Sequence, residues 1–349
     1  MSEEKHYQRT AIDTPKSLVN DDGTCNYGTF KDSFDSFNLL NYKRKFFSKF
    51  IKKMRLTEWE AVEILNDDFF LIAAVFKNGP LNFNLIQLYD IKNNELHDFG
   101  SKSLFVKKSQ TADNLYHNNV YERNTKTNKL RIINNLDKGY SEIQGSCIKG
   151  NKTLEIDIKI TRVADPSVVC IPLTTKNPLY TEKDLLIPEG IIKFNGKKIS
   201  FSKKHIAIID DHRGYYPYNS GYDWVTTMHD IEYRNKKAKF GINLTSFYKV
   251  DEPHIYNENG YWLEGEYHTL PLVKFLRQDN KWHITDENNN VDLTFTQLNK
   301  HQVYFNLLAV KLDYILAFGK ISGTIKTKDG DTITIDNKFA LGEKRYTRI

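Results

Sequence analysis

Apolar and polar residues alternate with a period of two through long stretches of this chain, and this pattern limits its fold more than any other feature. The alternation is clearest in residues 154–161 and 291–296, and it recurs in residues 224–229 and 240–250. Successive side chains of a β-strand point to opposite faces of a sheet, so each stretch predicts a strand with one buried face. Aromatic residues make up 13% of the chain, which is enough ring surface to fill extended cores.

Tight polar turns separate the predicted strands. Asn195-Gly196, Asn259-Gly260 and Asp329-Gly330 are typical of hairpins, because Asn, Asp and Gly tolerate the positive φ angles of primed turns. Short strands joined by such turns favour antiparallel sheets, and the sequence shows no βαβ pattern with crossover helices. The sequence therefore predicts an all-β protein of barrels or sandwiches with few short helices.

The 349 residues leave room for two domains. Residues 164–186 lack a regular alternation and contain three prolines, whereas a new strand pattern begins at Ile191. We therefore place a boundary near residues 188–190. This division gives an N-terminal extension over residues 1–29, a first β-domain over residues 30–188 and a second β-domain over residues 189–349.

Composition and missing motifs argue against several classes of function. A formal net charge of +6 is too small to predict nucleic-acid binding. The cysteines lie far apart, the histidines show no ligand spacing, and the common nucleotide-binding and metalloprotease motifs are absent, so we expect no metal and no cofactor. The chain shows no signal peptide and no apolar stretch of about 18 residues, which predicts a cytoplasmic protein.

The main predicted helix covers residues 42–55 and is strongly basic. Its apolar residues follow a helical stripe, and its other positions hold lysines and arginines without an acid. One interpretation is an amphipathic helix at an anionic membrane surface, which it contacts through Lys45, Lys49, Lys52 and Lys53. The other interpretation packs the stripe on a barrel and leaves the lysines in water, and we favour it because aromatic stripes usually belong to cores.

A dense group of polar residues follows the apolar residues 206–209. It consists of Asp210, Asp211, His212 and Arg213, with several aromatic residues soon after. Burial in a cavity raises the pKa of a carboxyl and lowers that of an imidazole, which suits both groups to proton transfer near neutral pH.

We predict that Asp211 is a general acid and that His212 is its partner. The walls of the ligand cavity are then formed by Tyr215, Tyr222 and Trp224. The alternative is a turn in which the acids cap backbone amides and pair with Arg213.

Two further residues are candidates for contact with a ligand. Asn243 lies on the opposite strand face from its apolar neighbours, so it faces a lumen if they pack outward and water if they pack inward. Glu343 is either a cavity carboxylate or a partner for Arg213.

The order of several short segments resembles a known family. These segments are residues 56–60, 211–224, 241–244, 270–275 and 342–343. From Leu56 onward the chain resembles the bacterial domain of unknown function 2804, within the carotenoid 1,2-hydratase-like, lipocalin-like superfamily. The resemblance implies two tandem lipocalin-like β-barrel domains that enclose a cavity. The wider superfamily includes enzymes that protonate alkenes to hydrate or cyclise isoprenoids.

Three functions are compatible with these features. The first, which we favour, is a β-barrel that binds a hydrophobic small molecule, isoprenoid or lipid-like, and acts on it by proton transfer as a hydratase, cyclase or isomerase. The second is a carrier that binds a lipid or pigment without chemistry. The third is a peripheral membrane protein that uses the basic helix. A close pair of convergent ionisable groups distinguishes the enzyme from the carrier.

Overall fold

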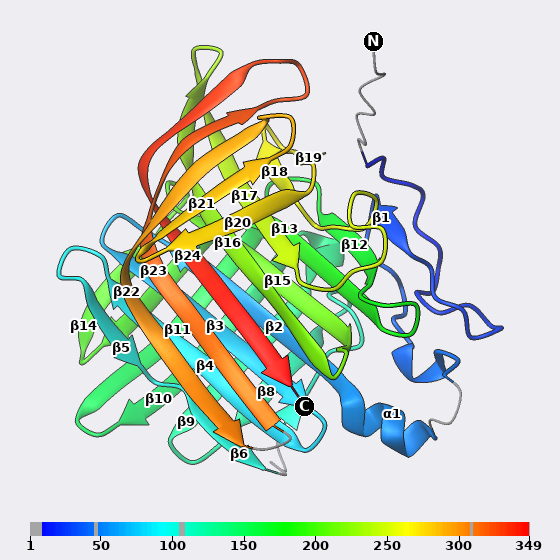
Figure 1. Ribbon diagram of the computed structural model, residues 1–349. Helices are drawn as coiled ribbons and strands as arrows, with labels where there is room; N and C mark the ends of the chain where they lie inside the picture. The colour runs from blue at the N-terminus through cyan, green and yellow to red at the C-terminus, as the bar shows by residue number, and fades with distance from the viewer. Residues whose placement is uncertain (1–8, 45–47, 105–108, 308–309, 349) are drawn as a thin grey trace.

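The computed structural model describes residues 9–44, 48–104, 109–307 and 310–348. Antiparallel strands dominate the chain and form two large sheets (Figure 1). The all-β fold with two tandem antiparallel sheets is therefore confirmed. The predicted alternation is visible in the strand over residues 152–162, where Leu154, Ile156, Ile158 and Ile160 are buried between exposed polar neighbours.

Within the described residues, the first sheet contains fifteen strands. Their bounds are β1 (Gly28–Phe30), β2 (Leu56–Leu65), β3 (Phe69–Asn78), β4 (Leu81–Asp90), β5 (Glu95–Asp98), β6 (Ser101–Leu104), β7 (Ser109–Gln110), β8 (Asn119–Asn124), β9 (Asn128–Asn135), β10 (Tyr140–Lys149), β11 (Lys152–Arg162), β12 (Ser167–Pro172), β13 (Pro178–Phe194), β14 (Lys197–Phe201) and β15 (Ile206–Tyr215). The order along the main path is β5-β4-β3-β2-β15-β13-β11-β10-β9-β8-β7. The sheet curls so that β4 approaches β8, although the two strands lie far apart in the strand order. The Asn84 amide on β4 donates to the Arg123 carbonyl on β8 at 3.1 Å.

The second sheet contains nine strands in the described part of the chain. Their bounds are β16 (Asn219–Tyr233), β17 (Lys236–Phe247), β18 (Gly260–Leu263), β19 (Glu266–Thr269), β20 (Val273–Gln278), β21 (Lys281–Asp286), β22 (Val291–Leu307), β23 (Val310–Lys326) and β24 (Thr332–Arg348). Their order is β19-β18-β17-β16-β24-β23-β22-β21-β20. The C-terminal strand therefore lies beside the first strand of its own sheet.

Three strands of the first sheet, β2, β13 and β15, form a wall that is buried on both faces. In β15, Ala207 and Ile209 join the core inside the curled sheet, whereas Ile206 and Ile208 join a second core that packs against β16, β23 and β24. Because successive side chains of a strand alternate in direction, each of these strands supplies residues to both cores. The polar residues of the wall are divided in the same way.

The division between the sheets differs from the predicted boundary. Residues 188–190 lie inside β13, and the chain passes from one sheet to the other between Tyr215 and Asn219. Gly190 has a φ angle of 139°, and a Cβ atom there would lie 2.3 Å from the Asp157 carbonyl oxygen. Pro188 and Gly190 therefore lie within a long strand, although in sequence they have the composition of a linker.

The turn predictions were right in part. Asn195 and Gly196 both have positive φ angles and join β13 to β14, as an Asn-Gly hairpin requires. Asn259-Gly260 is not a turn, since Gly260 begins β18 and the hairpin that follows turns at Glu264 and Gly265.

The helical content is small. The helices of the described residues are α1 (Lys49–Arg55) and two 3-10 turns, η1 (Leu39–Asn41) and η2 (Leu136–Lys138). The predicted helix over residues 42–55 was therefore too long at its start, and Lys45 lies outside the described residues. Ser48 caps α1, because its hydroxyl accepts from the Ile51 amide at 3.3 Å.

The predicted packing of the basic helix was wrong for the residues that the structure describes. Phe50 is 73% exposed, and Ile51 and Met54 are also exposed. Instead, Lys52 donates to the carbonyls of Leu40 and Tyr42 at 2.7 and 2.9 Å, and Arg55 donates to that of Tyr216 at 3.2 Å. Helix α1 therefore turns part of its basic face to the protein and its apolar residues to solvent.

Candidate functional site

Asp211 and His212 are adjacent in β15 but point to opposite faces of the wall. The Asp211 carboxylate accepts from Tyr121 and Arg213 inside the first sheet, whereas the His212 ring lies against Thr181 and Lys183 between the sheets. The predicted partnership of these two residues is therefore wrong, because neighbouring side chains of a strand cannot share a face. Each belongs to a separate polar cluster.

The Asp211 cluster is a group of buried carboxyls inside the first sheet. Arg213 donates to Asp211 from Nε at 3.0 Å and from Nη2 at 3.2 Å, and the Tyr121 hydroxyl donates at 2.9 Å. Glu60, on β2, accepts from the Asn134 amide at 2.8 and 3.0 Å. Asp211 is thus held as an acceptor, which commits both of its oxygens to protein donors.

Glu182 and Asp184, on β13, extend this group of carboxyls. Arg162 lies 2.7 Å from Asp184 and 3.5 Å from Glu182. Burial and the neighbouring Asp184 raise the pKa of Glu182 to about 8, despite Arg162. The interior of the first sheet therefore contains a carboxyl, that of Glu182, which is protonated near neutral pH.

The second group, which we call the inter-sheet cluster, lies between the two sheets. Its members are Trp59, Glu63, Thr181, Lys183, Asp210, His212, Tyr216, Tyr222, Glu258, Tyr314, Glu343 and Arg345. Its centre is the Lys183 ammonium, which lies 3.0 Å from Asp210, 3.1 Å from Glu258 and 2.9 Å from His212 Nε2. The His212 Nε2 atom also lies 3.0 Å from Asp210 Oδ1. Two carboxylates and an imidazole thus converge on one buried ammonium.

The charges at this centre stabilise one another. Burial alone would raise the pKa of Asp210 and Glu258, but Lys183 and His212 hold both pKa values below their ordinary range. Burial likewise opposes the charge on Lys183, and the two carboxylates reverse this effect and raise its pKa. The centre therefore carries two negative carboxylates and a positive ammonium at neutral pH.

Two other carboxyls in the inter-sheet cluster have the opposite tendency. Burial, with the charge of Asp210, raises the pKa of Glu63 well above its ordinary value. Burial also raises the pKa of Glu343, whose carboxyl accepts hydrogen bonds from Tyr222 and Tyr314. Glu63 and Glu343 consequently keep their protons to higher pH than ordinary carboxyls do, next to Asp210 and Glu258, whose pKa values are lowered.

Aromatic rings form one wall of the inter-sheet cluster. The His212 ring stacks on Trp59 with a centroid distance of 4.3 Å and an interplanar angle of 10°. The Arg345 guanidinium lies 4.7 Å from the Tyr216 ring, 5.9 Å from Tyr222 and 6.0 Å from Trp59. Trp59 and Tyr216 keep 8% and 9% of their surface exposed, so this wall is where the cluster comes near solvent.

A hydrogen-bonded chain holds the second sheet's side of the cluster in place. The Trp224 indole donates to Asn243 at 2.6 Å, and the Asn243 amide donates to the Glu258 carbonyl at 2.7 Å. The Thr245 hydroxyl donates to the Glu258 carboxylate at 2.5 Å. Asn243 therefore faces neither a lumen nor water, and it fixes the segment that carries Glu258.

The structure brings together only some of the predicted site residues. His212, Tyr222, Trp224, Asn243 and Glu343 all lie between the sheets. Tyr215 does not, since its hydroxyl donates to the Leu39 carbonyl and its ring packs under the N-terminal segment. The alternative pairing of Glu343 with Arg213 is also wrong, because Arg213 binds Asp211 on the other face of the wall.

Sequence reasoning missed the centre of the inter-sheet cluster. Lys183 lies in the stretch whose pattern is irregular, and Glu258 precedes an apparent Asn-Gly turn. The two residues are 75 positions apart, so no local spacing relates them. The signal that the sequence offered was a lysine between two acids. The structure shows that this stretch belongs to a continuously buried part of β13.

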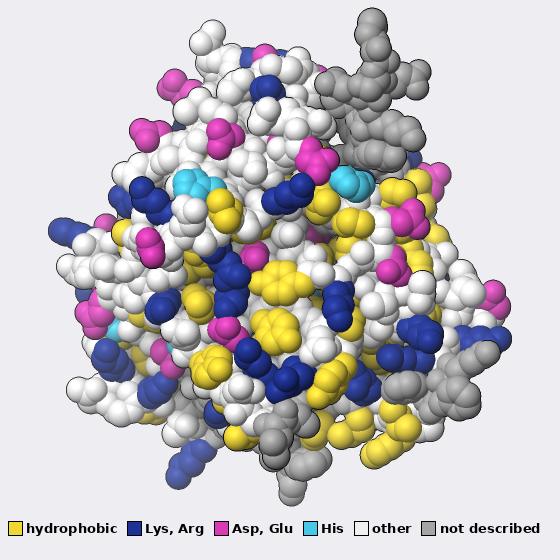
Figure 2. Space-filling view, in the orientation of Figure 1, with side chains coloured by type: hydrophobic (Ala, Val, Ile, Leu, Met, Phe, Trp, Pro, Cys, Tyr) yellow, Lys and Arg dark blue, Asp and Glu magenta, His cyan; other side chains and the backbone are white. Residues whose placement is uncertain are grey.

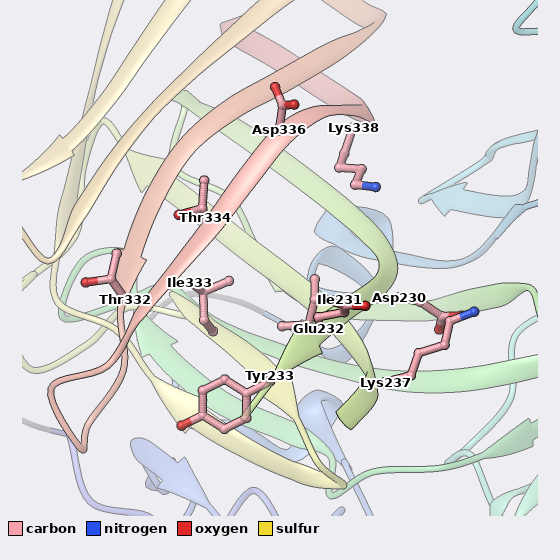
Figure 3. A pocket seen from close by; sticks show the side chains of 10 residues that line it. All are labelled: Asp230, Ile231, Glu232, Tyr233, Lys237, Thr332, Ile333, Thr334, Asp336 and Lys338. Atoms are coloured by element: carbon pink, nitrogen blue, oxygen red, sulfur yellow. The ribbon is translucent and has the colours of Figure 1, made fainter. Parts of the chain in front are cut away.

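A surface groove of about 670 Å³ lies away from this cluster, where β16 and β24 diverge (Figure 3). Their pairing covers residues 219–226 and 341–348, and the groove lies beyond it, between residues 230–233 and 332–338. It shares no residue with the inter-sheet cluster.

The described ranges contain no group of three His, Cys, Asp or Glu side chains placed to hold a metal ion. Over the same ranges, no helix has the length and apolar character needed to cross a bilayer.

Comparison with known proteins identifies the fold and the family. The chain is similar to the structure of kievitone hydratase from Nectria haematococca, with a TM-score of 0.51 and 12% identity over 83% of this chain and 88% of that one. It is also similar to a structure from Nitrosomonas europaea described as AttH, with a TM-score of 0.51 and 11% identity over 84% and 92% of the two chains. No curated protein matches the sequence.

Both structural similarities show a shared fold, in agreement with the predicted lipocalin-like β architecture. The sequence itself matches the family described as Domain of unknown function (DUF2804) over residues 9–349. The match includes the segments whose order suggested this family. The chain therefore belongs to the DUF2804 family.

Proposed function

We propose that this protein binds a hydrophobic small molecule, isoprenoid or lipid-like, at the inter-sheet cluster and acts on it by cofactor-independent acid–base chemistry. One observation carries the proposal. A carboxyl with a raised pKa, Glu343, lies in the same buried cluster as an imidazole, His212, and as several aromatic rings. A carboxyl with a raised pKa beside other convergent ionisable groups is typical of a functional site.

Glu343 is the proton donor in this proposal. Its protonated carboxyl gives a proton to one carbon of an alkene, and the π electrons form the new C–H bond. The other carbon becomes a cation, which the negative carboxylates of Asp210 and Glu258 in the same cluster stabilise. Burial favours this step in two ways, because it keeps the carboxyl protonated to higher pH until the substrate is bound and it excludes water that would compete for the proton.

His212 is the base that completes the reaction. If water attacks the cation, the imidazole accepts the released proton and the product is an alcohol. If no water enters, the imidazole removes a proton from a neighbouring carbon, which moves the double bond or ends a cyclisation. Lys183 and Asp210 orient the ring through His212 Nε2. The ring's Nδ1 atom is buried and has no hydrogen-bond partner among the described residues.

The prediction that Asp211 is the acid is not carried into this proposal, because its carboxylate forms an ion pair with Arg213 and lies on the other face of the wall from the inter-sheet cluster. Support for hydratase-type chemistry also comes from the fold, since kievitone hydratase has a similar one. The carrier function is the less favoured alternative, because a passive pocket does not require convergent ionisable groups.

The test begins with the ligand. Native mass spectrometry and organic extraction of the protein from its own host identify any bound isoprenoid or lipid. The extract is then incubated with the protein in heavy water, and deuterium on a new C–H bond is measured by mass spectrometry. Hydration, cyclisation and isomerisation each incorporate one solvent proton by this route, whereas a carrier incorporates none.

Glu343→Gln keeps an acceptor for the Tyr222 hydroxyl but has no proton to give. We expect it to bind the extracted ligand and to lose deuterium incorporation by at least about 100-fold, the usual size of a general-acid contribution. Asp211→Asn is the matched control and should retain incorporation. Retained incorporation in Glu343→Gln, or its loss in Asp211→Asn alone, would refute the assignment.

A further inference from the structure

Exposed apolar side chains gather at one end of the molecule, on two separate elements. The first is α1, with Phe50, Ile51 and Met54. The second is the tip of the β22–β23 hairpin. Its exposed side chains are Tyr304 at 59%, Phe305 at 37%, Leu307 at 68% and Val310 at 36%. We call these seven side chains the lower apolar surface, because both elements lie at the lower end of Figure 1.

Strand pairing places the two elements at the same end of the sheets. Helix α1 runs directly into β2, whose first residue Leu56 pairs with Tyr215 at the end of β15. Four residues later Asn219 begins β16 and pairs with Arg348, which in turn pairs with Lys311 beside the hairpin tip. The path from helix to tip therefore crosses only neighbouring strand ends.

Helix α1 is fixed with its apolar residues outward. Lys52 and Arg55, which are three positions apart, share a face of the helix, and both donate to backbone carbonyls of the protein. Phe50, Ile51 and Met54 are therefore held in solvent by polar anchors. Side chains of this size are normally buried, and their grouping at an exposed end is typical of an interaction surface.

The charges around the lower apolar surface are cationic. Lys49 and Lys53 flank Phe50 and are exposed, and neither forms an ion pair within the described part of the chain. Helix α1 contains no acid, and Asp313, which follows the hairpin tip in sequence, is bound by Lys344. Figure 2 shows dark blue and yellow side chains together at this lower end.

We infer that the lower apolar surface docks the protein on an anionic lipid bilayer. Two exposed apolar elements, one of them flanked by Lys49 and Lys53, fit the boundary between headgroups and acyl chains, where apolar side chains enter by about 5–10 Å and lysines meet lipid phosphates. Aromatic rings such as Tyr304 and Phe305 suit this boundary. The inference is independent of the chemistry proposed for the inter-sheet cluster, and it would bring a lipid-like ligand close to that cluster.

Sedimentation with vesicles tests the inference on the full chain. The probes are phosphatidylcholine vesicles with and without phosphatidylserine. We expect binding to the phosphatidylserine vesicles that weakens as salt is raised, because salt screens the lysine charges. A lysine near an anionic surface contributes about fivefold in affinity, so Lys49→Gln with Lys53→Gln should weaken binding about 30-fold.

The apolar contribution has its own matched pair of variants. Phe50→Ser with Leu307→Ser should weaken binding at least about tenfold. Leu276→Ser is the control, since Leu276 is 58% exposed on β20, outside the lower apolar surface. All three sites are exposed, so the fold is retained.

Three results would overturn the inference. One is the absence of wild-type binding to phosphatidylserine vesicles. Another is equal binding to both vesicle types without a salt effect. The third is association of the protein with itself, seen by analytical ultracentrifugation and removed by Phe50→Ser, which would assign this surface to a second copy of the chain.

Discussion

A Lys183→Met substitution removes the ammonium that lies 3.0 Å from Asp210 and 3.1 Å from Glu258 between the sheets. Breaking a buried ion pair by removing one partner costs about 3–5 kcal/mol, because the other charge is left without compensation. Lys183 compensates two carboxylates, so we expect the free energy of unfolding at pH 7 to fall by about 5 kcal/mol. Methionine fills a similar volume, so little of this loss comes from a cavity.

The assay is urea unfolding, followed by tryptophan fluorescence. Lys193→Met is the matched control. Lys193 pairs with Glu155 on the surface, where the two side chains are 47% and 60% exposed, and such pairs contribute at most about 1 kcal/mol. A triple variant with Lys183→Met, Asp210→Asn and Glu258→Gln should recover most of the stability, because no uncompensated charge remains.

The dependence on pH gives a second measurement of the same effect. In the wild type the pKa values of Asp210 and Glu258 are lowered. Their stabilisation is therefore present above the ordinary carboxyl pKa and is lost as pH falls toward the lowered values. In Lys183→Met both carboxyls can relieve their burial by binding protons, so the difference between variant and wild type should shrink from pH 7 to about pH 4. A loss below about 1 kcal/mol at pH 7, or a difference independent of pH, would refute this reasoning.

Three further perturbations have defined outcomes. Glu182→Gln should flatten the dependence of folding stability on pH. The pKa of about 8 lets the folded wild type keep a proton that the unfolded state loses near pH 4.5, so wild-type stability should fall between about pH 5 and 8. Urea midpoints measured at both pH values will show this fall in the wild type and its reduction in the variant. Asn243→Ala leaves the buried Trp224 indole and the Glu258 segment without their partner, so the free energy of unfolding should fall by about 2–4 kcal/mol. A fall of less than about 0.5 kcal/mol would contradict the role assigned to Asn243. Gly190→Ala places a Cβ against backbone at a φ of 139°, so it should lower the thermal midpoint. An unchanged midpoint would mean that β13 does not need a glycine at this position.

The sequence alone determined the architecture wherever one face of a strand meets water. In β11, buried isoleucines alternate with exposed polar residues, and this pattern has a period that a helix cannot satisfy. Asn195-Gly196 likewise determined its turn locally, because both residues tolerate positive φ. The family followed from the order of short segments, a property of the whole chain that requires no contact information.

The tertiary structure decided the composition of the candidate site. All ten residues of β15 are buried, so no alternation distinguishes the face of Asp211 from the face of His212. Lys183 and Glu258 meet through the packing of one sheet on the other, and the orientation of α1 depends on carbonyls that its basic residues reach. Local sequence patterns encode exposure to water, whereas these contacts depend on which buried surfaces meet, and that is fixed only when the two sheets pack together.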